Sequence, residues 1–161
     1  RGALCKTIAF LPTPPELDLD SPTPHLSVEP QIREVTVVFV KLDGKRIQEA
    51  LEDATCSMLP VVEDIISAAQ HSLVQYNGML RQFLVDDKGM VLIFALGVPK
   101  CVHVDDSIRG LQTALHFCRA LARLKIQAFA GVTTGQAYIG TIGTKARKEY
   151  ALVGDTVNLA A

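Results

Sequence analysis

The feature that most constrains the fold is a change in hydrophobic period between residues 35 and 76. Val35–Leu42 is a nearly continuous run of apolar, mainly β-branched residues, which predicts a strand buried on both faces. The stretch Asp53–Tyr76 instead has the period of a long amphipathic helix. Its apolar residues are Met58, Leu59, Val62, Ile65, Ile66, Ala69 and Leu73. The sequence therefore opens its folded part with a strand followed by a helix.

A hairpin is predicted next. Asn77-Gly78 is a helix-stop signal, and the strands Met79–Val85 and Met90–Leu96 follow it. The residues between these strands, 86–89, supply the Asp and Gly that tight turns favour. This segment therefore adds two antiparallel strands after the first helix.

A second helix is expected after the capping residues 105–107. Its apolar stripe consists of Ile108, Leu111, Leu115, Cys118, Leu121 and Leu124. Strands are then predicted at Ile126–Thr133 and Gln136–Ile142, with a turn at Thr134-Gly135, and another strand precedes a helix within Glu149–Ala161. The order up to Ile126–Thr133 is β-α-β-β-α-β, with Gln136–Ile142 as one more strand before the terminal strand and helix, and it indicates an α/β (α+β) domain of the ferredoxin-like class. Its sheet would have one helix-covered face and one face open to a partner.

Residues 1–33 differ in composition from the rest of the chain. They contain six of its eight prolines, at positions 12, 14, 15, 22, 24 and 30, together with scattered acidic residues. Such a stretch cannot hold a helix or a central strand, so we interpret 1–33 as a linker or arm and 34–161 as the domain. A proline-motif ligand is the alternative interpretation.

Composition and charge exclude several classes of protein. A net charge of −1 gives no support for a nucleic-acid or anionic-membrane partner, and no apolar run reaches membrane-spanning length. The four cysteines lack CxxC spacing, and the histidines do not cluster with them, which argues against a zinc site. We interpret them as reduced cysteines of a cytoplasmic protein.

Generic phosphate-binding motifs are missing from the sequence. There is no Walker A loop, and Gly140-Thr141-Ile142-Gly143 does not open a helix after a strand. We interpret the glycines at 131, 135, 140 and 143 as turn or close-packing positions. No Ser/His/Asp or Cys/His arrangement can be assembled from the sequence.

Five segments nevertheless occur in the order and spacing of the class III nucleotidyl cyclase catalytic domain, which this chain resembles. They are Val37–Val40, Asp87–Gly89, Gly131–Gly135, Gly140–Gly143 and Glu149–Ala160. The similarity is greatest to the second, C2-like half of soluble, bicarbonate-responsive adenylyl cyclases. We expect the domain to be incomplete at its C-terminus, with the family's catalytic Arg beyond Ala161.

The resemblance implies a site shared by two cyclase domains, in which one half holds Mg²⁺ or Mn²⁺ through two carboxylates. Lys41 stands near the first metal position and would repel a cation. Asp43, two residues on, and Asp86 and Asp87 in the hairpin are weaker alternatives, since turn chemistry explains the hairpin pair. We therefore expect no metal site in this chain and assign the metals mainly to the partner half.

The other half of such a site recognises the base and orients the ribose. Asn158 matches the ribose-orienting Asn; its alternative role is to satisfy backbone groups at a helix start. Asp155 is expected to lie by the nucleotide, although capping of the last helix suits it better.

The base-reading positions of the family fall near Gln82 and at Ala151. Gln82 can donate and accept hydrogen bonds to a purine, whereas Ala151 offers no side-chain hydrogen bond. Arg81 would point to the other face of a regular strand. The choice between ATP and GTP is therefore weakly encoded.

These features favour a C2-like half of an adenylyl cyclase, which makes cyclic AMP and pyrophosphate from ATP together with a second cyclase domain and is inactive alone. The alternative is a degenerate cyclase domain that acts as a dimerisation or regulatory module, favoured by Lys41, Gln82 and Ala151. A ferredoxin-like RNA-binding module is disfavoured, because the basic patch and exposed aromatic residues that it needs are missing.

Overall fold

The computed structural model describes residues 30–43, 58–86, 89–144 and 148–161. Its sheet contains β1 (Gln31–Asp43), β2 (Met79–Asp86), β3 (Gly89–Leu96), β4 (Gln127–Gly143) and β5 (Lys148–Val153). The strand order is β2-β3-β1-β4-β5, and all neighbours are antiparallel. The predicted mixed fold with a βαββαβ order is confirmed, and β5 is the strand that follows this order.

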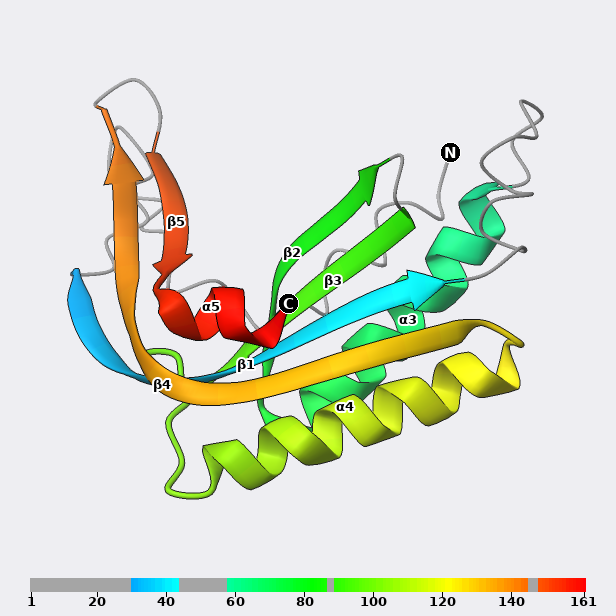
Figure 1. Ribbon diagram of the computed structural model, residues 1–161, viewed down its shortest axis with the longest axis horizontal. Helices are drawn as coiled ribbons and strands as arrows, with labels where there is room; N and C mark the ends of the chain where they lie inside the picture. The colour runs from blue at the N-terminus through cyan, green and yellow to red at the C-terminus, as the bar shows by residue number, and fades with distance from the viewer. Residues whose placement is uncertain (1–29, 44–57, 87–88, 145–147) are drawn as a thin grey trace, which may run out of the picture.

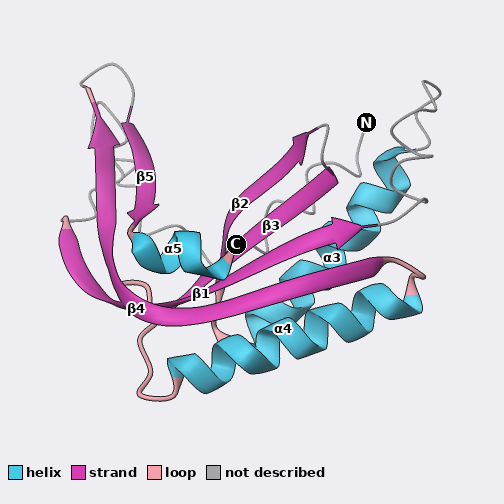
Figure 2. Ribbon diagram, viewed as in Figure 1, coloured by secondary structure: helices cyan, strands magenta, loops and turns pink. Residues whose placement is uncertain are grey.

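Within the described residues, three helices accompany this sheet. The helices α3 (Met58–Tyr76) and α4 (Asp106–Arg123) lie side by side on one face, and the short α5 (Asp155–Ala160) lies on the other (Figure 1). Figure 2 shows that the sheet curls, so that β4–β5 rise on one side of α5 and β2–β3 on the other. We call the side that holds α5 the concave face.

The predicted stop of the first long helix is confirmed. Asn77 adopts a positive φ of 56°, and the Gly78 N–H donates to the Leu73 carbonyl at 2.9 Å. A left-handed residue directly after a helix is a common way to satisfy its last carbonyl groups. The expected start of this helix, residues 53–57, lies outside the described residues.

The apolar core divides between the two faces of the sheet. On the helix-covered face, β1 and β3 pack against both long helices around Phe94 and Phe117, whose rings make an edge contact at 5.2 Å. The cluster on the concave face consists mainly of smaller residues: Val35, Val37, Ile93, Ala95, Val98, Ala137, Ile139, Leu152 and Ala160. Since β1 and β3 contribute to both clusters, their near-continuous hydrophobicity follows from burial on both sides.

Two sequence predictions are wrong. The turn at Thr134-Gly135 does not exist, because β4 is continuous and pairs Thr134 with Thr36 and Gly135 with Val35. The apolar stripe predicted for the second helix is buried only at its end, since Leu121 is buried whereas Ile108, Leu111 and Leu115 are exposed on α4. The buried face of α4 consists of Asp106, Gly110, Thr113, Ala114, Phe117 and Leu121.

Among the described residues, no helix is long and apolar enough to cross a membrane. The expected arm at the N-terminus lies almost wholly outside these residues, and β1 begins at Gln31, inside the segment interpreted as that arm.

Candidate functional site

The close approach of α5 to β4 is made possible by glycine. A Cβ atom added to Gly131 would lie 2.0 Å from the Ala160 carbonyl oxygen, and one added to Gly135 would lie 2.7 Å from the Thr156 hydroxyl oxygen. Both distances are shorter than side chains tolerate. The predicted close-packing role of these two glycines is therefore confirmed, and the contact holds the last helix directly against the concave face of β4.

Threonine hydroxyl groups fix the position of this helix further. The Thr133 hydroxyl donates to the Thr156 carbonyl at 2.6 Å, and the Thr156 hydroxyl donates to the Gln136 carbonyl at 3.1 Å. Thr156 is buried, so these hydrogen bonds are poorly replaced by water. They fix α5 in one place on β4.

Both predicted site residues of α5 are exposed. Asn158 lies in the middle of the helix with its side chain open to solvent. Asp155 is the first helical residue, whereas the N-cap is Gly154, and no side-chain hydrogen bond caps this helix. Capping by Asp155 is therefore wrong; its carboxylate instead lies in the first turn, where the helix dipole favours negative charge.

Gln82 lies on β2, at the other edge of the sheet from β5. A register irregularity between Leu80 and Gln82 pairs Gln82 with Ile93, a residue of the concave-face cluster. Gln82 is exposed and on the concave side, while Phe83 packs with the helix-covered core. The irregularity also removes the basis for placing Arg81 on the opposite face, because the strand is not regular there.

Ala151 and its neighbour Tyr150 lie on opposite sides of β5. Tyr150 packs against the concave-face cluster, and Ala151 is buried on the alternate side, paired with Gly140. The pKa of Tyr150 is raised by burial, and the positive charges of Arg81 and Arg33 oppose that rise. Arg81 belongs to β2 and Tyr150 to β5, so the charge that acts on this tyrosine comes from the strand at the other end of the sheet order.

Sequence reasoning did not identify this group of Arg33, Arg81 and Tyr150. The Nε atoms of both arginines are buried without a hydrogen-bond partner among the described residues. The strand irregularity that places Arg81 has no glycine or proline to signal it, so no sequence pattern could have revealed the group.

The described residues contain no metal-binding set. No group of three His, Cys, Asp or Glu side chains within residues 30–43, 58–86, 89–144 and 148–161 is placed to hold an ion. Lys41 is exposed on β1, in register with Val91 and Phe129. The side chains of Asp43, Asp86 and Asp87 lie outside the described part, so the weaker metal alternatives stay predictions.

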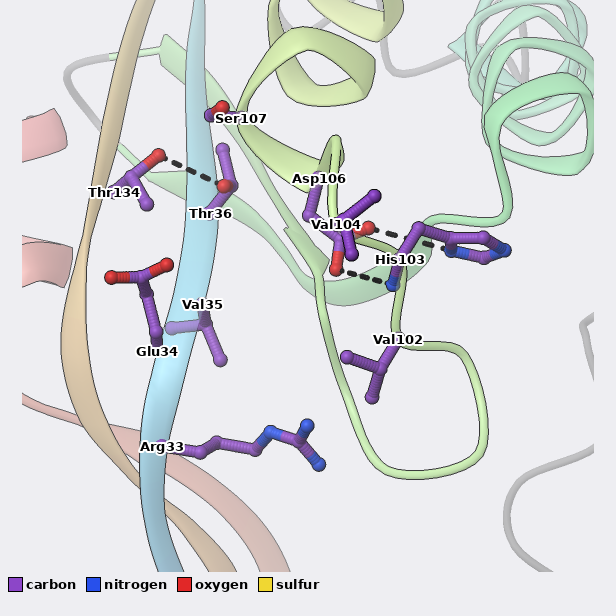
Figure 3. Close-up of a pocket in the computed structure, with 10 residues that line it drawn as sticks. All are labelled: Arg33, Glu34, Val35, Thr36, Val102, His103, Val104, Asp106, Ser107 and Thr134. Atoms are coloured by element: carbon purple, nitrogen blue, oxygen red, sulfur yellow. Dashed lines mark hydrogen bonds and ion pairs between the residues drawn. The ribbon is translucent and has the colours of Figure 1, made fainter.

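A separate pocket of about 180 Å³ lies between the start of β1 and the loop before α4 (Figure 3). Its polar groups include Arg33, Glu34, His103 and Asp106, and the Thr36 and Thr134 hydroxyl groups are 2.9 Å apart beside it. Charges of both signs meet here, so the pocket has no clear preference for an anion or a cation.

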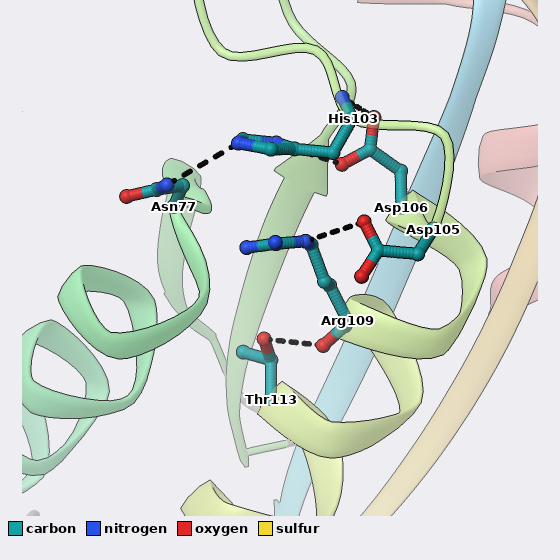
Figure 4. A network of polar contacts seen from close by, with 6 residues as sticks. All are labelled: Asn77, His103, Asp105, Asp106, Arg109 and Thr113. Atoms are coloured by element: carbon teal, nitrogen blue, oxygen red, sulfur yellow. Dashed lines mark hydrogen bonds and ion pairs between the residues drawn. The ribbon is translucent and has the colours of Figure 1, made fainter.

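The polar contacts next to this pocket join the end of α3 to the start of α4 (Figure 4). The Arg109 Nε donates to the Asp105 carboxylate at 2.7 Å, and the His103 backbone N–H donates to the Asp106 carboxylate at 2.9 Å. The hydrogen bond from Arg109 lowers the pKa of Asp105. Asn77 Nδ2 and His103 Nε2 are 3.4 Å apart, so this network bridges both helices.

Sequence comparison relates the chain to curated cyclases. It is 28% identical over 134 residues to adenylate cyclase type 10 of Homo sapiens, a match that covers 81% of this chain and 8% of that protein. The chain therefore spans less than a tenth of the length of this relative. No family model matches the sequence.

Solved structures share the fold. The adenylyl cyclase CyaB from P. aeruginosa matches with a TM-score of 0.71 at 19% identity, covering 83% of this chain and 71% of that one. The guanylate cyclase domain of RhGC from Catenaria anguillulae, solved with GTP, matches with a TM-score of 0.66 at 21% identity, covering 81% and 71%. Adenylyl and guanylyl cyclases are thus both among the structures that share this fold.

Proposed function

We propose that this class III nucleotidyl cyclase domain supplies the C2-like half of an adenylyl cyclase site, which it shares with a metal-binding cyclase domain. The substrate is ATP, and the products are cyclic AMP and pyrophosphate. The similarity to adenylate cyclase type 10 supports the choice of ATP.

The observation that carries this proposal is the anchoring of α5. Gly131, Gly135 and the Thr133–Thr156 hydrogen bond hold this helix on the concave face with Asn158 exposed. A side chain that orients a ribose must be held within a fraction of an ångström, because misplacement costs rate steeply. The chain fixes the helix and leaves the Asn side chain open, which is what a positioning group for a nucleotide in a shared site needs.

This chain's own residues would bind and orient the nucleotide. The Asn158 amide would hold the ribose so that its 3′-hydroxyl faces the α-phosphate, and Gln82 would hydrogen-bond the base edge. Asp155, in the first turn of α5, would lie beside the nucleotide. Ala151 is buried on the side of β5 opposite Tyr150 and offers the base no polar group, so base selectivity on this side depends on Gln82.

The divalent metal belongs to the partner half. When bound, Mg²⁺ or Mn²⁺ neutralises charge on the triphosphate. The exposed Lys41 stands near the family's first metal position and does not fit a cation site. We therefore assign no metal ligand to this chain.

The second candidate function is a cyclase domain without turnover that serves as a dimerisation or regulatory module. Lys41 and the buried methyl group of Ala151 favour it, because each replaces a polar function of the family's site. Such a module would pair with the same partner domain but would catalyse no reaction.

Co-expression of the full natural chain with a metal-binding adenylyl cyclase domain separates the two. We expect cyclic AMP to form with Mg²⁺ or Mn²⁺, and Asn158→Ala to lower kcat by at least tenfold while its exposed neighbour variant Leu159→Ala leaves kcat within twofold. Stable pairing of the two domains with no cyclic AMP or cyclic GMP would establish the module instead.

A further inference from the structure

The outer surface of α4 carries an apolar stripe that no described element covers. Ile108, Leu111 and Leu115 are 58%, 52% and 48% exposed, although α4 already buries a separate face against β1, β4 and α3. Figure 1 shows α4 along the outside of the helical layer. A helix needs one apolar face to pack on its sheet, so the second stripe is in excess of what the fold requires.

The spacing of this stripe is that of a helix-pairing seam. Its residues within the helix alternate steps of three and four along the chain: Ile108, Leu111, Leu115, Cys118 and Ala122. A run of this period presents one continuous edge to a neighbouring helix. Val104, just before the helix, is fully exposed, and Ala122 is exposed as well.

The stripe is also complementary to itself in the antiparallel direction. If a second α4 lies antiparallel with Thr113 of both copies level, Leu111 meets Leu115 and Ile108 meets Cys118. Large side chains at one end of the seam thus oppose small ones at the other. A parallel pairing would put large against large and leave a gap at the small end.

The charged residues of α4 also favour antiparallel pairing, because acidic and basic residues lie at opposite ends of the helix. Asp105, whose partly exposed carboxylate also bonds Arg109, lies at its start, whereas the exposed Arg119 and Arg123 lie in its last two turns. An antiparallel pair places each acidic end beside the basic end of the other copy, and it also opposes the two helix dipoles. A parallel pair would bring like charges together.

We propose that the exposed α4 stripe is a self-association surface, on which a second copy of this chain docks with its α4 antiparallel about a two-fold axis near Thr113. Such an interface is isologous, as closed dimers require. It uses the helix-covered side of the domain and leaves the concave face free for the proposed cyclase partner. The inference is therefore independent of the proposed function.

Sedimentation equilibrium of the 161-residue chain tests the interface over about 1 to 200 µM. We expect a concentration-dependent dimer that Leu111→Glu shifts to monomer, with a dissociation constant raised at least tenfold. The matched controls Val74→Glu, on the exposed side of α3, and Leu159→Glu, on the concave face, should leave the dimer intact. A strictly monomeric chain, or a dimer that is lost in Leu159→Glu but not in Leu111→Glu, would overturn the proposal.

Cross-linking tests the direction of pairing. Under mild oxidation Ile108→Cys should give a disulfide-linked dimer, because position 108 faces the native Cys118 of the second copy. The double variant Ile108→Cys/Cys118→Ala should lose that band, whereas a parallel pair would keep it through two thiols at position 108. Far-ultraviolet circular dichroism of each variant verifies that the fold is retained.

Discussion

The two faces of the sheet differ in what their side chains do. The helix-covered face buries large residues around Phe94 and Phe117 beneath two long helices, whereas the concave face carries mainly small aliphatic residues, two glycines and a short helix fixed by hydroxyl groups. Large interlocking side chains give stability, while small ones allow backbone to approach backbone. The comparison indicates that one face holds the fold together and the other positions a site.

The largest effect should come from the helix-covered face. Phe117→Ala removes a fully buried ring that contacts Phe94, and we expect it to lower the free energy of unfolding by about 3–5 kcal/mol. Urea denaturation followed by circular dichroism measures this loss. Leu159→Ala, an exposed change on the concave face, should cost less than about 0.5 kcal/mol. Similar losses for the two variants would erase the distinction between the faces.

Gly131→Ala should damage the concave face with a smaller loss of stability. The new methyl group meets the Ala160 carbonyl, so α5 must move, at a cost of about 1–3 kcal/mol. We expect cyclic AMP formation with a partner domain to fall far more than folding does. Ala130→Val, an exposed neighbour on β4, serves as the control. Full activity of Gly131→Ala would show that the position of α5 is not critical.

Thr133→Val tests the same difference between the two faces with a smaller loss of stability. It removes the hydroxyl group that donates to the Thr156 carbonyl, and we expect a loss of about 1 kcal/mol together with looser anchoring of α5. Hydrogen exchange of the α5 amides should rise while that of α3 stays unchanged. Equal acceleration in both helices would mean that the hydrogen bond supports the whole fold.

The smallest effect concerns Tyr150. Burial raises the pKa of Tyr150 in the folded state, so its neutral form is favoured, and the resulting penalty appears only as the pH rises above the ordinary tyrosine value near 10. Arg81→Gln removes an opposing positive charge and should raise this pKa further. Carbon-13 NMR of labelled tyrosine measures the shift, with Arg119→Gln as the control. An unchanged Tyr150 pKa in Arg81→Gln would show that the charge on β2 does not act on β5.

The sequence predicted the fold well because hydrophobic period distinguishes strands from helices. It failed at Thr134-Gly135, where a dipeptide typical of turns lies inside a long strand. The reason is tertiary: Gly135 accommodates Thr156 of a helix that lies far along the chain, and Thr134 bonds the Thr36 hydroxyl. Turn composition alone cannot distinguish a bend from a place where another backbone approaches.

The orientation of α4 shows a second limit. Its apolar residues at 108, 111 and 115 have ideal helical spacing, yet Gly110, Thr113, Ala114 and Phe117 form the buried side. Small residues are buried here because α4 packs tightly on β1: a Cβ added to Gly110 would lie 2.4 Å from the Thr36 side chain. For the site, the resemblance to the cyclase family identified Asn158. The strand irregularity beside Gln82 and the group around Tyr150 depend on strand pairing, which the hydrophobic period of the sequence does not reveal.

The long pairing of β1 with β4 has a consequence for biosynthesis. Gln31 pairs with Ile139 and Asp43 with Gln127, so a central strand made early finds one of its two neighbours only when nearly the whole domain has left the ribosome. Contacts this distant in sequence slow folding, and until they form β1 presents an unsatisfied hydrogen-bonding edge of apolar residues. We therefore expect nascent chains that stop short of β4 to need chaperone protection, whereas the β2–β3 hairpin can form as soon as it emerges.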